Sequence, residues 1–272
     1  MTVSLVVPGS SEKMLGKAAT LAADEIVLDL EDAVAVGAKE RARELVRSAL
    51  PGLDRLVAVR INEVGSPWVL DDVLALVRSD KPPNSLVIPK VESRDDVAFL
   101  DKLLGGLGSR IRLQLLIETA KGIRHLDTIL SGSDRVDAVI LGYADLAASL
   151  GSAAYAPDGS WAPYQAAVVS AARAAGVQPV DGPYLTLDDA AGLAASIAEA
   201  RAQGFSGKWA IHPSQVEPAV AGFMPTEQEV ATARAVLVQL EESYDGALRL
   251  DGQMIDEAVA KAARALLSRV GT

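Results

Sequence analysis

The feature that most constrains this chain is a regular alternation of short apolar runs with longer amphipathic segments along most of its 272 residues. The apolar runs are rich in Val, Ile and Leu throughout, which is typical of parallel strands buried on both faces. The segments between them have helical periodicity, and this alternation predicts βα units around a parallel sheet. We expect strands at 4–8, 25–30, 55–61, 85–91, 112–118, 136–143, 178–182 and 208–212. Helices are expected at 12–21, 38–50, 69–77, 94–104, 120–130, 164–175, 187–203 and 214–221.

Eight βα units predict an α/β fold of the TIM barrel type over residues 1–223. Two segments exceed the minimal barrel. Residues 149–163, rich in Gly, Ser, Ala and Pro, interrupt the sixth unit and predict a lid or a contact surface on the catalytic face. Residues 224–272 predict a C-terminal helical extension, with one helix at about 226–244 and an Ala-rich helix at its end. We expect this extension to be part of the same domain.

The composition excludes several classes of function. A formal net charge of −10, without any basic run, excludes a nucleic-acid surface, which needs clustered Lys and Arg. The absence of cysteine excludes disulfides, thiolate zinc sites and cysteine nucleophiles, and it fits a reducing compartment. The first eight residues lack the features of a signal peptide, and no apolar run approaches the roughly 20 residues that cross a membrane. We therefore expect a cytoplasmic protein whose partner is a small molecule.

Two carboxylates narrow the chemistry most. Glu118 closes the apolar run 113–117, and Asp145 follows the run 139–143. In a TIM barrel the C-terminal ends of the strands form the catalytic face, so acids from consecutive strands can meet on one metal ion. Each acid alone could equally cap the helix that follows it, because Asp and Glu favour helix starts. The pair in this context predicts a metal site.

Further polar residues fall at the expected strand ends: Asp29, Glu31, Asp32, Arg60, Asn62, Lys90, Asp181 and His212. Acids gathered there would repel one another unless a cation and the basic Arg60 and Lys90 offset them. Asp29 lies inside a strand and has a structural alternative, a pair with a neighbouring lysine. His212 precedes a proline and is expected to shape a turn. His125 is expected on the outer surface of a helix.

The expected ligands favour a hard cation, Mg²⁺ first and Mn²⁺ second, because the candidates are oxygen atoms. Glu118 and Asp145 are predicted as direct metal ligands. Glu31 and Asp32 are predicted to accept hydrogen bonds from metal-bound waters. Arg60 can hold a carboxylate by two parallel hydrogen bonds, which predicts a substrate contact. The alternative for Arg60 is an ion pair with one of the acids, and the two roles are compatible.

Seven motifs resemble, in this order, those of the citrate lyase β-subunit-like proteins, within the superfamily of HpcH/HpaI-type aldolases and malyl-CoA lyases. They are Pro8-Gly9-Ser10, Leu28-Asp29-Leu30-Glu31-Asp32-Ala33, Val59-Arg60-Ile61-Asn62, Ile88-Pro89-Lys90-Val91-Glu92, Ile117-Glu118-Thr119-Ala120, Gly142-Tyr143-Ala144-Asp145-Leu146 and Ala210-Ile211-His212-Pro213-Ser214-Gln215. The resemblance covers nearly the whole chain.

The resemblance implies a Mg²⁺-dependent TIM-barrel enzyme that cleaves or forms a C–C bond between a coenzyme A or acyl-carrier thioester and a keto acid. It implies that Glu118 and Asp145 bind the metal and that Arg60 binds the substrate carboxylate. The backbone amides from Gly142 through Ala144 to Asp145 would contact the same carboxylate. The coenzyme A arm would approach the Pro8-Gly9-Ser10 loop and Lys13.

One departure from the pattern separates branches of the superfamily. Aldolases of the HpaI branch use a histidine near the start of the barrel as base, and this chain has no histidine before residue 125. A carbon–carbon lyase acting on a short β-hydroxyacyl-CoA, such as citramalyl-CoA or malyl-CoA, is therefore the leading hypothesis. The alternatives are the β subunit of a multi-subunit citrate lyase, which splits a citryl-carrier thioester to oxaloacetate, and a binding subunit without catalytic activity.

The C-terminal extension also resembles part of the stand-alone CoA lyases, through Gly252-Gln253-Met254-Ile255-Asp256. In those lyases the tail reaches the catalytic face of a neighbouring subunit. The resemblance thus implies a homo-oligomer, with a trimer favoured, in which Asp256 acts as the acid or base in the site of the next chain. The alternative is that Asp256 only caps the last helix.

Overall fold

The computed structural model describes residues 2–152, 161–242, 248–250, 253–268 and 270. The chain forms two compact units, Thr2–Val220 and Ala221–Thr272, which are described separately below. The division between the units falls within helix α10 (Val216–Phe223), and the barrel boundary expected at residue 223 stays a prediction. That the two units act as one domain stays a prediction.

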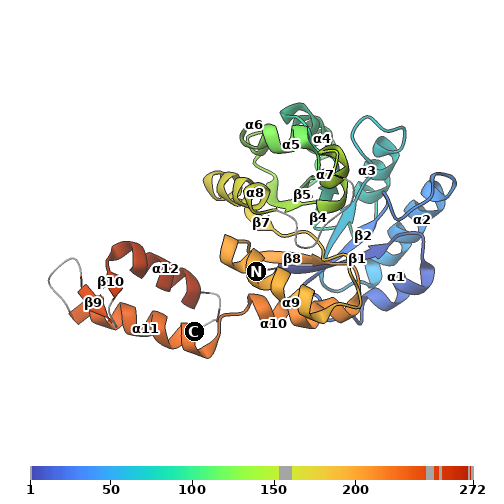
Figure 1. The fold of residues 1–272 in the computed structure, drawn as a ribbon. Coiled ribbons are helices and arrows are strands. Elements are labelled where there is room, and N and C mark those ends of the chain that lie inside the picture. The colour runs from blue at the N-terminus through green and yellow to red at the C-terminus, as the bar shows by residue number, and fades with distance from the viewer. Residues whose placement is uncertain (1, 153–160, 243–247, 251–252, 269, 271–272) are drawn as a thin grey trace. The chain divides into compact units, whose positions relative to one another are not determined.

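The first unit is the predicted TIM barrel, which confirms the expected fold class (Figure 1). Its eight parallel strands are arranged in the order β7-β6-β5-β4-β3-β2-β1-β8. A bridge between Asp181 and Lys208 joins the two edges of this sheet. The strands are β1 (Thr2–Pro8), β2 (Glu25–Asp29), β3 (Leu56–Arg60), β4 (Ser85–Ile88), β5 (Arg112–Ile117), β6 (Val136–Leu141), β7 (Gln178–Val180) and β8 (Gly207–Ala210).

The helices of this unit follow the strands in sequence and lie around the sheet (Figure 1). They are α1 (Glu12–Ala18), α2 (Lys39–Ala49), α3 (Val69–Val77), α4 (Arg94–Gly106), α5 (Ala120–Arg124), α6 (Leu126–Leu130), α7 (Tyr143–Ser149), α8 (Ala162–Ala175), α9 (Ala190–Gln203) and α10. Short 3₁₀ turns occur at Val36–Ala38, Leu50–Gly52 and Pro213–Gln215.

Local sequence signals set several helix ends. Ser93 and Asp96 form a reciprocal capping box at the start of α4, which satisfies backbone N–H groups that the helix itself leaves unbonded. Gly176 and Gly204 end α8 and α9 with positive φ angles of 72° and 98°, a conformation that glycine adopts without strain. These caps agree with the predicted ends of both helices.

Several predicted boundaries differ from the structure by a few residues, and two of the differences change how a segment is assigned. The helix expected at 120–130 is divided into α5 and α6 at His125, whose Nδ1 contacts the Glu92 carbonyl oxygen at 3.0 Å. The strand expected to reach residue 143 ends at Leu141, because Tyr143 already begins α7. The long loop expected at 149–163 lies mostly outside the described residues.

The barrel interior is filled by one apolar cluster, with Trp209 as its largest member. Val27, Ala58 and Leu116 belong to it, together with Val6, Val87, Ala138, Ile140 and Val180. Side chains two residues apart on a strand share a face. The residues that follow Val27, Ala58 and Leu116 by two positions are Asp29, Arg60 and Glu118. The strand periodicity therefore directs these three side chains to the same side of the sheet as the apolar cluster, at the C-terminal ends of the strands.

The opposite end of the barrel has its own buried polar group. Glu25 accepts hydrogen bonds from Ser4 Oγ at 2.7 Å and Gln114 Nε2 at 2.8 Å. Burial raises the pKa of Glu25 above its ordinary value. A cavity of about 710 Å³ opens beside these residues and includes Asp137 and Arg112 in its lining. This cavity and the carboxylates at the C-terminal strand ends thus lie at different ends of one barrel.

The second unit contains α11 (Glu227–Glu242), α12 (Glu257–Leu267) and an antiparallel pair of strands, β9 (Leu248–Leu250) and β10 (Gln253–Ile255). Ala233, Val236, Ile255 and Ala263 form its apolar core. Helices are present in this extension as predicted, although the end of the first helix, expected near residue 244, lies outside the described residues. No helix within the described ranges is long and apolar enough to cross a membrane.

Candidate active site

Asp29, the last residue of β2, anchors the acidic loop that follows it. Its carboxylate is fully buried and accepts the backbone N–H groups of Glu31 at 2.9 Å and Ala33 at 3.1 Å. The same carboxylate accepts two hydrogen bonds from Arg60, from Nε at 2.7 Å and from Nη2 at 2.6 Å. Asp29 therefore pairs with an arginine and not with a neighbouring lysine, the pair that the sequence analysis kept as an alternative. The Asp29 carboxylate therefore determines the conformation of the acidic loop and also fixes the position of the Arg60 guanidinium.

Arg60, the last residue of β3, contacts the acidic loop as well as Asp29. Its Nη1 also lies 3.2 Å from Glu31 Oε2 and 3.8 Å from Asp32 Oδ2. Burial disfavours the charge on Arg60, but Asp29 and Glu31 outweigh it and raise the pKa of the guanidinium above its ordinary value. A guanidinium has five N–H donors, and Asp29 takes two of them. The ion pairs that the sequence analysis named as the alternative for Arg60 are thus present, and a contact of its remaining N–H groups with a substrate carboxylate stays a prediction.

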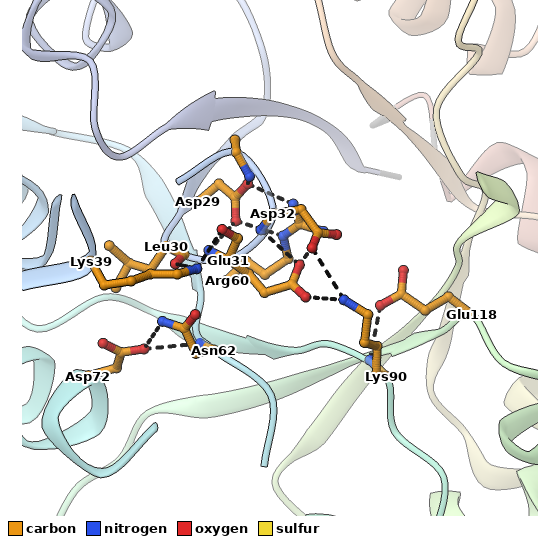
Figure 2. A network of polar contacts seen from close by, with 11 residues as sticks. Asp29, Leu30, Glu31, Asp32, Lys39, Arg60, Asn62, Asp72, Lys90 and Glu118 are labelled. Atoms are coloured by element: carbon orange, nitrogen blue, oxygen red, sulfur yellow. Dashed lines mark hydrogen bonds and ion pairs between the residues drawn. The ribbon is translucent and has the colours of Figure 1, made fainter. Parts of the chain in front are cut away.

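Lys90 connects the acidic loop to Glu118 (Figure 2). Its Nζ donates to Glu31 Oε1 and to Asp32 Oδ1, the second at 3.3 Å. Its backbone N–H donates to Glu118 Oε1 at 3.0 Å. Among the described residues, Lys90 is the only non-glycine with positive φ, at 50°. Such a conformation is strained for a residue with a side chain and persists where the surroundings determine it.

Glu118 directly follows β5 and is only 2 % exposed. Burial, with Asp145 and Glu31 adding to it and Arg60 and Lys90 opposing it, raises the pKa of Glu118 to about 8. Because Lys90 occupies Oε1, the other carboxylate oxygen is the one available to a further partner. That oxygen faces Gly142, where an added Cβ would lie 2.7 Å from Glu118 Oε2 and 2.6 Å from Glu118 Cβ. Glycine is therefore required at position 142 for Glu118 to keep this position.

Asp145 lies in the first turn of α7 and is half-buried. It is close enough to Glu118 to raise the pKa of that carboxyl. The backbone amides of Gly142 and Ala144 lie just before it in the chain, and the Gly142 N–H donates to the Ile117 carbonyl oxygen at 2.9 Å. The structure thus brings Glu118, Asp145, Arg60 and the acidic loop together at one end of the barrel.

The residues present fit a hard divalent cation. Within the described part of the chain, no three His, Cys, Asp or Glu side chains are grouped tightly enough to hold a metal by themselves. Mg²⁺ does not need such a cage, because it binds through one or two carboxylates and keeps its remaining positions for water and substrate. Glu118 retains a proton near neutral pH because burial and nearby negative charge disfavour its ionised form. A cation beside it would replace that proton and offset the same repulsion.

Other predicted residues have different surroundings. Asp181 was grouped with the acids of the site, which is wrong: it binds Lys208 Nζ and the Tyr143 hydroxyl, and Lys208 also contacts Ser196 of α9. Its side chain thus points to the helix side of the sheet. His212 accepts the Ser214 N–H at 3.2 Å through Nδ1, which confirms its predicted role in a turn.

Lys13 is exposed on α1, which begins just beyond the C-terminal end of β1. The loop before it packs closely on the acidic loop, since the Gly9 N–H donates to the Asp29 carbonyl oxygen at 2.8 Å. An added Cβ at Gly9 would lie 2.5 Å from that oxygen. Lys13 is thus on the same end of the barrel as the carboxylates.

Asp256 belongs to the second unit and caps α12, accepting the N–H groups of Ala258 at 3.0 Å and Val259 at 3.1 Å. This is the capping role that the sequence analysis kept as its alternative. Met254, two residues earlier, is 72 % exposed. A part in catalysis for Asp256 stays a prediction.

The fold and the site together define a class of protein, an α/β barrel with two carboxylates and an arginine placed around a position for a hard cation. The chain matches the model of the HpcH/HpaI aldolase/citrate lyase family over residues 3–213, and it belongs to this family. This confirms the family expected from the seven motifs.

Known proteins similar to this chain carry related names. It is 36 % identical to an L-malyl-CoA/beta-methylmalyl-CoA lyase of Rhodobacter capsulatus, over 96 % of this chain and 91 % of that protein. It is 35 % identical to a (3S)-malyl-CoA thioesterase of Cereibacter sphaeroides, over 97 % of this chain and 93 % of the other.

Solved structures agree with these relatives. Protein CitE of Mycobacterium tuberculosis, in complex with magnesium, acetoacetate and coenzyme A, superposes with a TM-score of 0.86 at 30 % identity, over 100 % of this chain and 98 % of that chain. The citrate lyase beta subunit of the same organism, complexed with oxaloacetate and magnesium, gives a TM-score of 0.71 at 29 % identity, over 82 % of this chain and 97 % of that chain.

Proposed function

We propose that this protein is a Mg²⁺-dependent carbon–carbon lyase that cleaves or forms a short β-hydroxyacyl-CoA, such as malyl-CoA or citramalyl-CoA. Its products would be an acyl-CoA and a keto acid. The observation that carries the proposal is the grouping of Glu118, Asp145 and Arg60 at the C-terminal end of the barrel. Similarity to a malyl-CoA lyase over 96 % of the chain supports it.

Each residue has a chemical task in this proposal. Glu118 and Asp145 would hold Mg²⁺, with Mn²⁺ as a substitute. Arg60 holds the carboxylate of the keto-acid half, because Asp29 fixes its guanidinium in plane for a two-point contact. The backbone amides of Ala144 and Asp145, in the first turn of α7, donate to the same carboxylate, whereas the Gly142 N–H is occupied by the Ile117 carbonyl oxygen.

The cation supplies one part of the chemistry when bound, the stabilisation of negative charge on the oxygen atoms of the keto-acid half. The protein contributes orientation, since the carboxylate held by Arg60 sets which C–C bond lies beside the metal ligands. Lys13 lies on the face where we propose that the coenzyme A arm approaches, and its ammonium suits a phosphate group.

The tasks assigned above leave the proton transfer at the thioester half without a residue, and Asp256 is our candidate for that role. We propose a homotrimer in which Asp256 of one chain completes the site of the next. The test is to dissociate, mix and reassemble the inactive variants Glu118→Ala and Asp256→Ala. Activity should return in the mixture, because some sites would then combine an intact metal site with an intact tail. A mixture without activity, or a fully active Asp256→Ala variant, would contradict the shared site.

The central experiment incubates the purified chain with Mg²⁺ and a panel of β-hydroxyacyl-CoA compounds, and measures keto acid and acyl-CoA. Activity should disappear in chelator and in the Glu118→Ala and Asp145→Ala variants, which should stay folded because their side chains lie at the end of the barrel. Near-normal turnover of either variant in chelator would show that the metal assignment is wrong.

The same assay separates two other functions. Similarity to a malyl-CoA thioesterase raises hydrolysis as a second candidate, which would release free coenzyme A and a hydroxy acid without keto acid. A citrate lyase β subunit would be inactive on these compounds and active on a citryl-carrier thioester. A cytoplasmic location is proposed from the cysteine-free composition, and cell fractionation tests it.

A further inference from the structure

A chain of buried polar side chains runs behind the candidate site, on the helix side of the sheet. It joins Lys208 of β8, Asp181 after β7, Tyr143 at the start of α7 and Gln165 of α8. Each of the four residues is at most 4 % exposed. None of them belongs to the metal or substrate contacts proposed above.

The hydrogen bonds of this chain are nearly complete. Lys208 Nζ donates to Asp181 Oδ2, to the Gly182 carbonyl oxygen at 2.9 Å and to Ser196 Oγ at 3.0 Å. The Tyr143 hydroxyl donates to Asp181 Oδ1. The same hydroxyl accepts a hydrogen bond from Gln165 Nε2 at 2.8 Å.

A buried ion pair is weak evidence for stability, because removing two charges from water costs much of what their attraction returns. Such a network does fix the orientation of side chains, since hydrogen bonds specify one arrangement where apolar contacts allow several. Here the hydrogen bonds fix the orientation of the Tyr143 ring. The Lys208–Asp181 pair also lies at the bridge that joins the two edges of the barrel, so its position is fixed by the backbone.

Tyr143 is held along its ring as well as at its hydroxyl. The Trp161 ring packs edge-on against it with centroids 5.2 Å apart. Gly182 lies close to one edge of the Tyr143 ring, since an added Cβ at Gly182 would be 2.9 Å from Tyr143 Cδ2. A side chain restrained at its tip and along its ring also restrains its own backbone.

That backbone carries the candidate metal ligand. Tyr143 follows Gly142, which touches Glu118, and precedes Asp145 by two residues on α7. Helix α7 has only seven residues, so the orientation of its first turn depends strongly on the residue that anchors it. Asp145, in that turn, needs a defined orientation to reach a cation shared with Glu118.

We propose that Tyr143 is the positioning residue of Asp145, and that the buried Asp181–Lys208 pair holds it in place. This inference rests on the proposed role of Asp145 in metal binding. Tyr143 does not touch the metal or the substrate in this account. It acts by fixing the turn that bears Asp145.

The test compares Tyr143→Phe with Ser196→Ala in the full chain. Tyr143→Phe removes the two hydrogen bonds of the hydroxyl, to Asp181 and from Gln165. Ser196→Ala removes one hydrogen bond of the same buried network, to Lys208, and none to Tyr143. Binding of Mg²⁺ is measured by calorimetry, and unfolding is followed by circular dichroism. Both variants should unfold at a lower temperature. Only Tyr143→Phe should weaken Mg²⁺ binding, by at least about fivefold, the factor associated with the loss of one hydrogen bond.

Equal Mg²⁺ affinity in the two variants would overturn the inference, because Tyr143 would then serve stability alone. If Tyr143→Phe does not fold, Gln165→Met decides, since it removes the other hydrogen bond of the hydroxyl and leaves the ion pair intact. Weaker Mg²⁺ binding in Gln165→Met supports the inference, and unchanged binding overturns it.

A double-mutant cycle separates this inference from the proposed function. Asp145→Asn should weaken Mg²⁺ binding, and adding Tyr143→Phe to it should weaken binding little further, because both changes act on one ligand. Full additivity would overturn the positioning role. Normal Mg²⁺ binding by Asp145→Asn would instead refute the metal assignment on which the proposal rests.

Discussion

Binding of Mg²⁺ to this protein should release a proton from Glu118. The carboxyl is 2 % exposed, and burial with nearby acids raises its pKa to about 8 in the absence of a cation. A metal ligand must be ionised, so the proton leaves when the metal binds. At pH 7, a group with this pKa is about nine-tenths protonated, and binding should release roughly 0.9 proton per ion.

The apparent affinity for Mg²⁺ should therefore depend on pH with a defined sign and range. It should rise about tenfold per pH unit between roughly pH 6 and 8, and level off above pH 8, where Glu118 is already ionised. Calorimetric titration in buffers of different ionisation enthalpy measures the affinity and the released protons together. Because the metal alone is titrated, the measurement does not depend on turnover.

Two variants serve as controls for this prediction. Glu118→Gln should bind Mg²⁺ weakly and release no proton from this position. Glu25→Gln removes another buried glutamate, at the opposite end of the barrel, and should leave the pH dependence unchanged. An affinity that is flat between pH 6 and 8, or binding without proton release, would refute the reasoning that burial keeps Glu118 protonated.

Three further predictions concern individual residues. Arg60→Lys should lower kcat/KM at least about tenfold, which corresponds to roughly 1.4 kcal/mol, because lysine lacks the planar two-point contact; unchanged kinetics would leave Arg60 a structural ion-pair partner. Gly142→Ala should weaken Mg²⁺ binding at least about tenfold, because its Cβ would lie 2.7 Å from Glu118 Oε2; normal affinity in a titration would contradict this. Burial raises the pKa of Glu25, so the stability linked to its proton is present at low pH and is lost as pH rises above 4.5. In Glu25→Gln, the fall in unfolding temperature with rising pH should be smaller than in the natural protein, and an identical pH profile would disprove that linkage.

The sequence predicted the fold because buried parallel strands leave continuous apolar runs that are hard to mistake in series. Helix α9 ends where predicted since Gly204 marks its end. The division at His125 had no comparable signal, because no glycine or proline stands at that point. Tyr143 was assigned to a strand because an aromatic residue after an apolar run fits a strand as well as a helix start.

The sequence predicted which residues lie at the C-terminal ends of the strands. It did not predict which of their side chains point into the barrel and which point toward the helices. Glu118 and Asp181 both follow apolar strands. Glu118 lies two residues after Leu116 of the interior cluster, so the two side chains share a face of the sheet. Asp181 lies one residue after Val180 of the same cluster, so its side chain points to the opposite face. In strands that are apolar on both faces, the sequence does not show which face a residue belongs to, because no polar position marks the outer side. The left-handed conformation of Lys90 and the close approach at Gly142 depend on tertiary contacts, which no local pattern encodes.

The joining of β7 to β8 also has a consequence for how the barrel opens. Strand β7 has three residues, and three backbone hydrogen bonds join this part of the chain to β8 and the residue before it. They run from Ser206 N–H to Pro179 O at 2.8 Å, from Asp181 N–H to Gly207 O at 2.9 Å and from Trp209 N–H to Asp181 O at 2.9 Å. A line with so few hydrogen bonds is where local unfolding starts most readily, so amide hydrogen exchange at Asp181 and Trp209 should be faster than within β5 and β6. The buried Lys208–Asp181 ion pair adds a side-chain contact to this junction between β7 and β8. Because Asp181 also binds the Tyr143 hydroxyl, opening of the junction would release α7 as well. We therefore expect slow opening of the barrel wall and loss of order at the site to occur together.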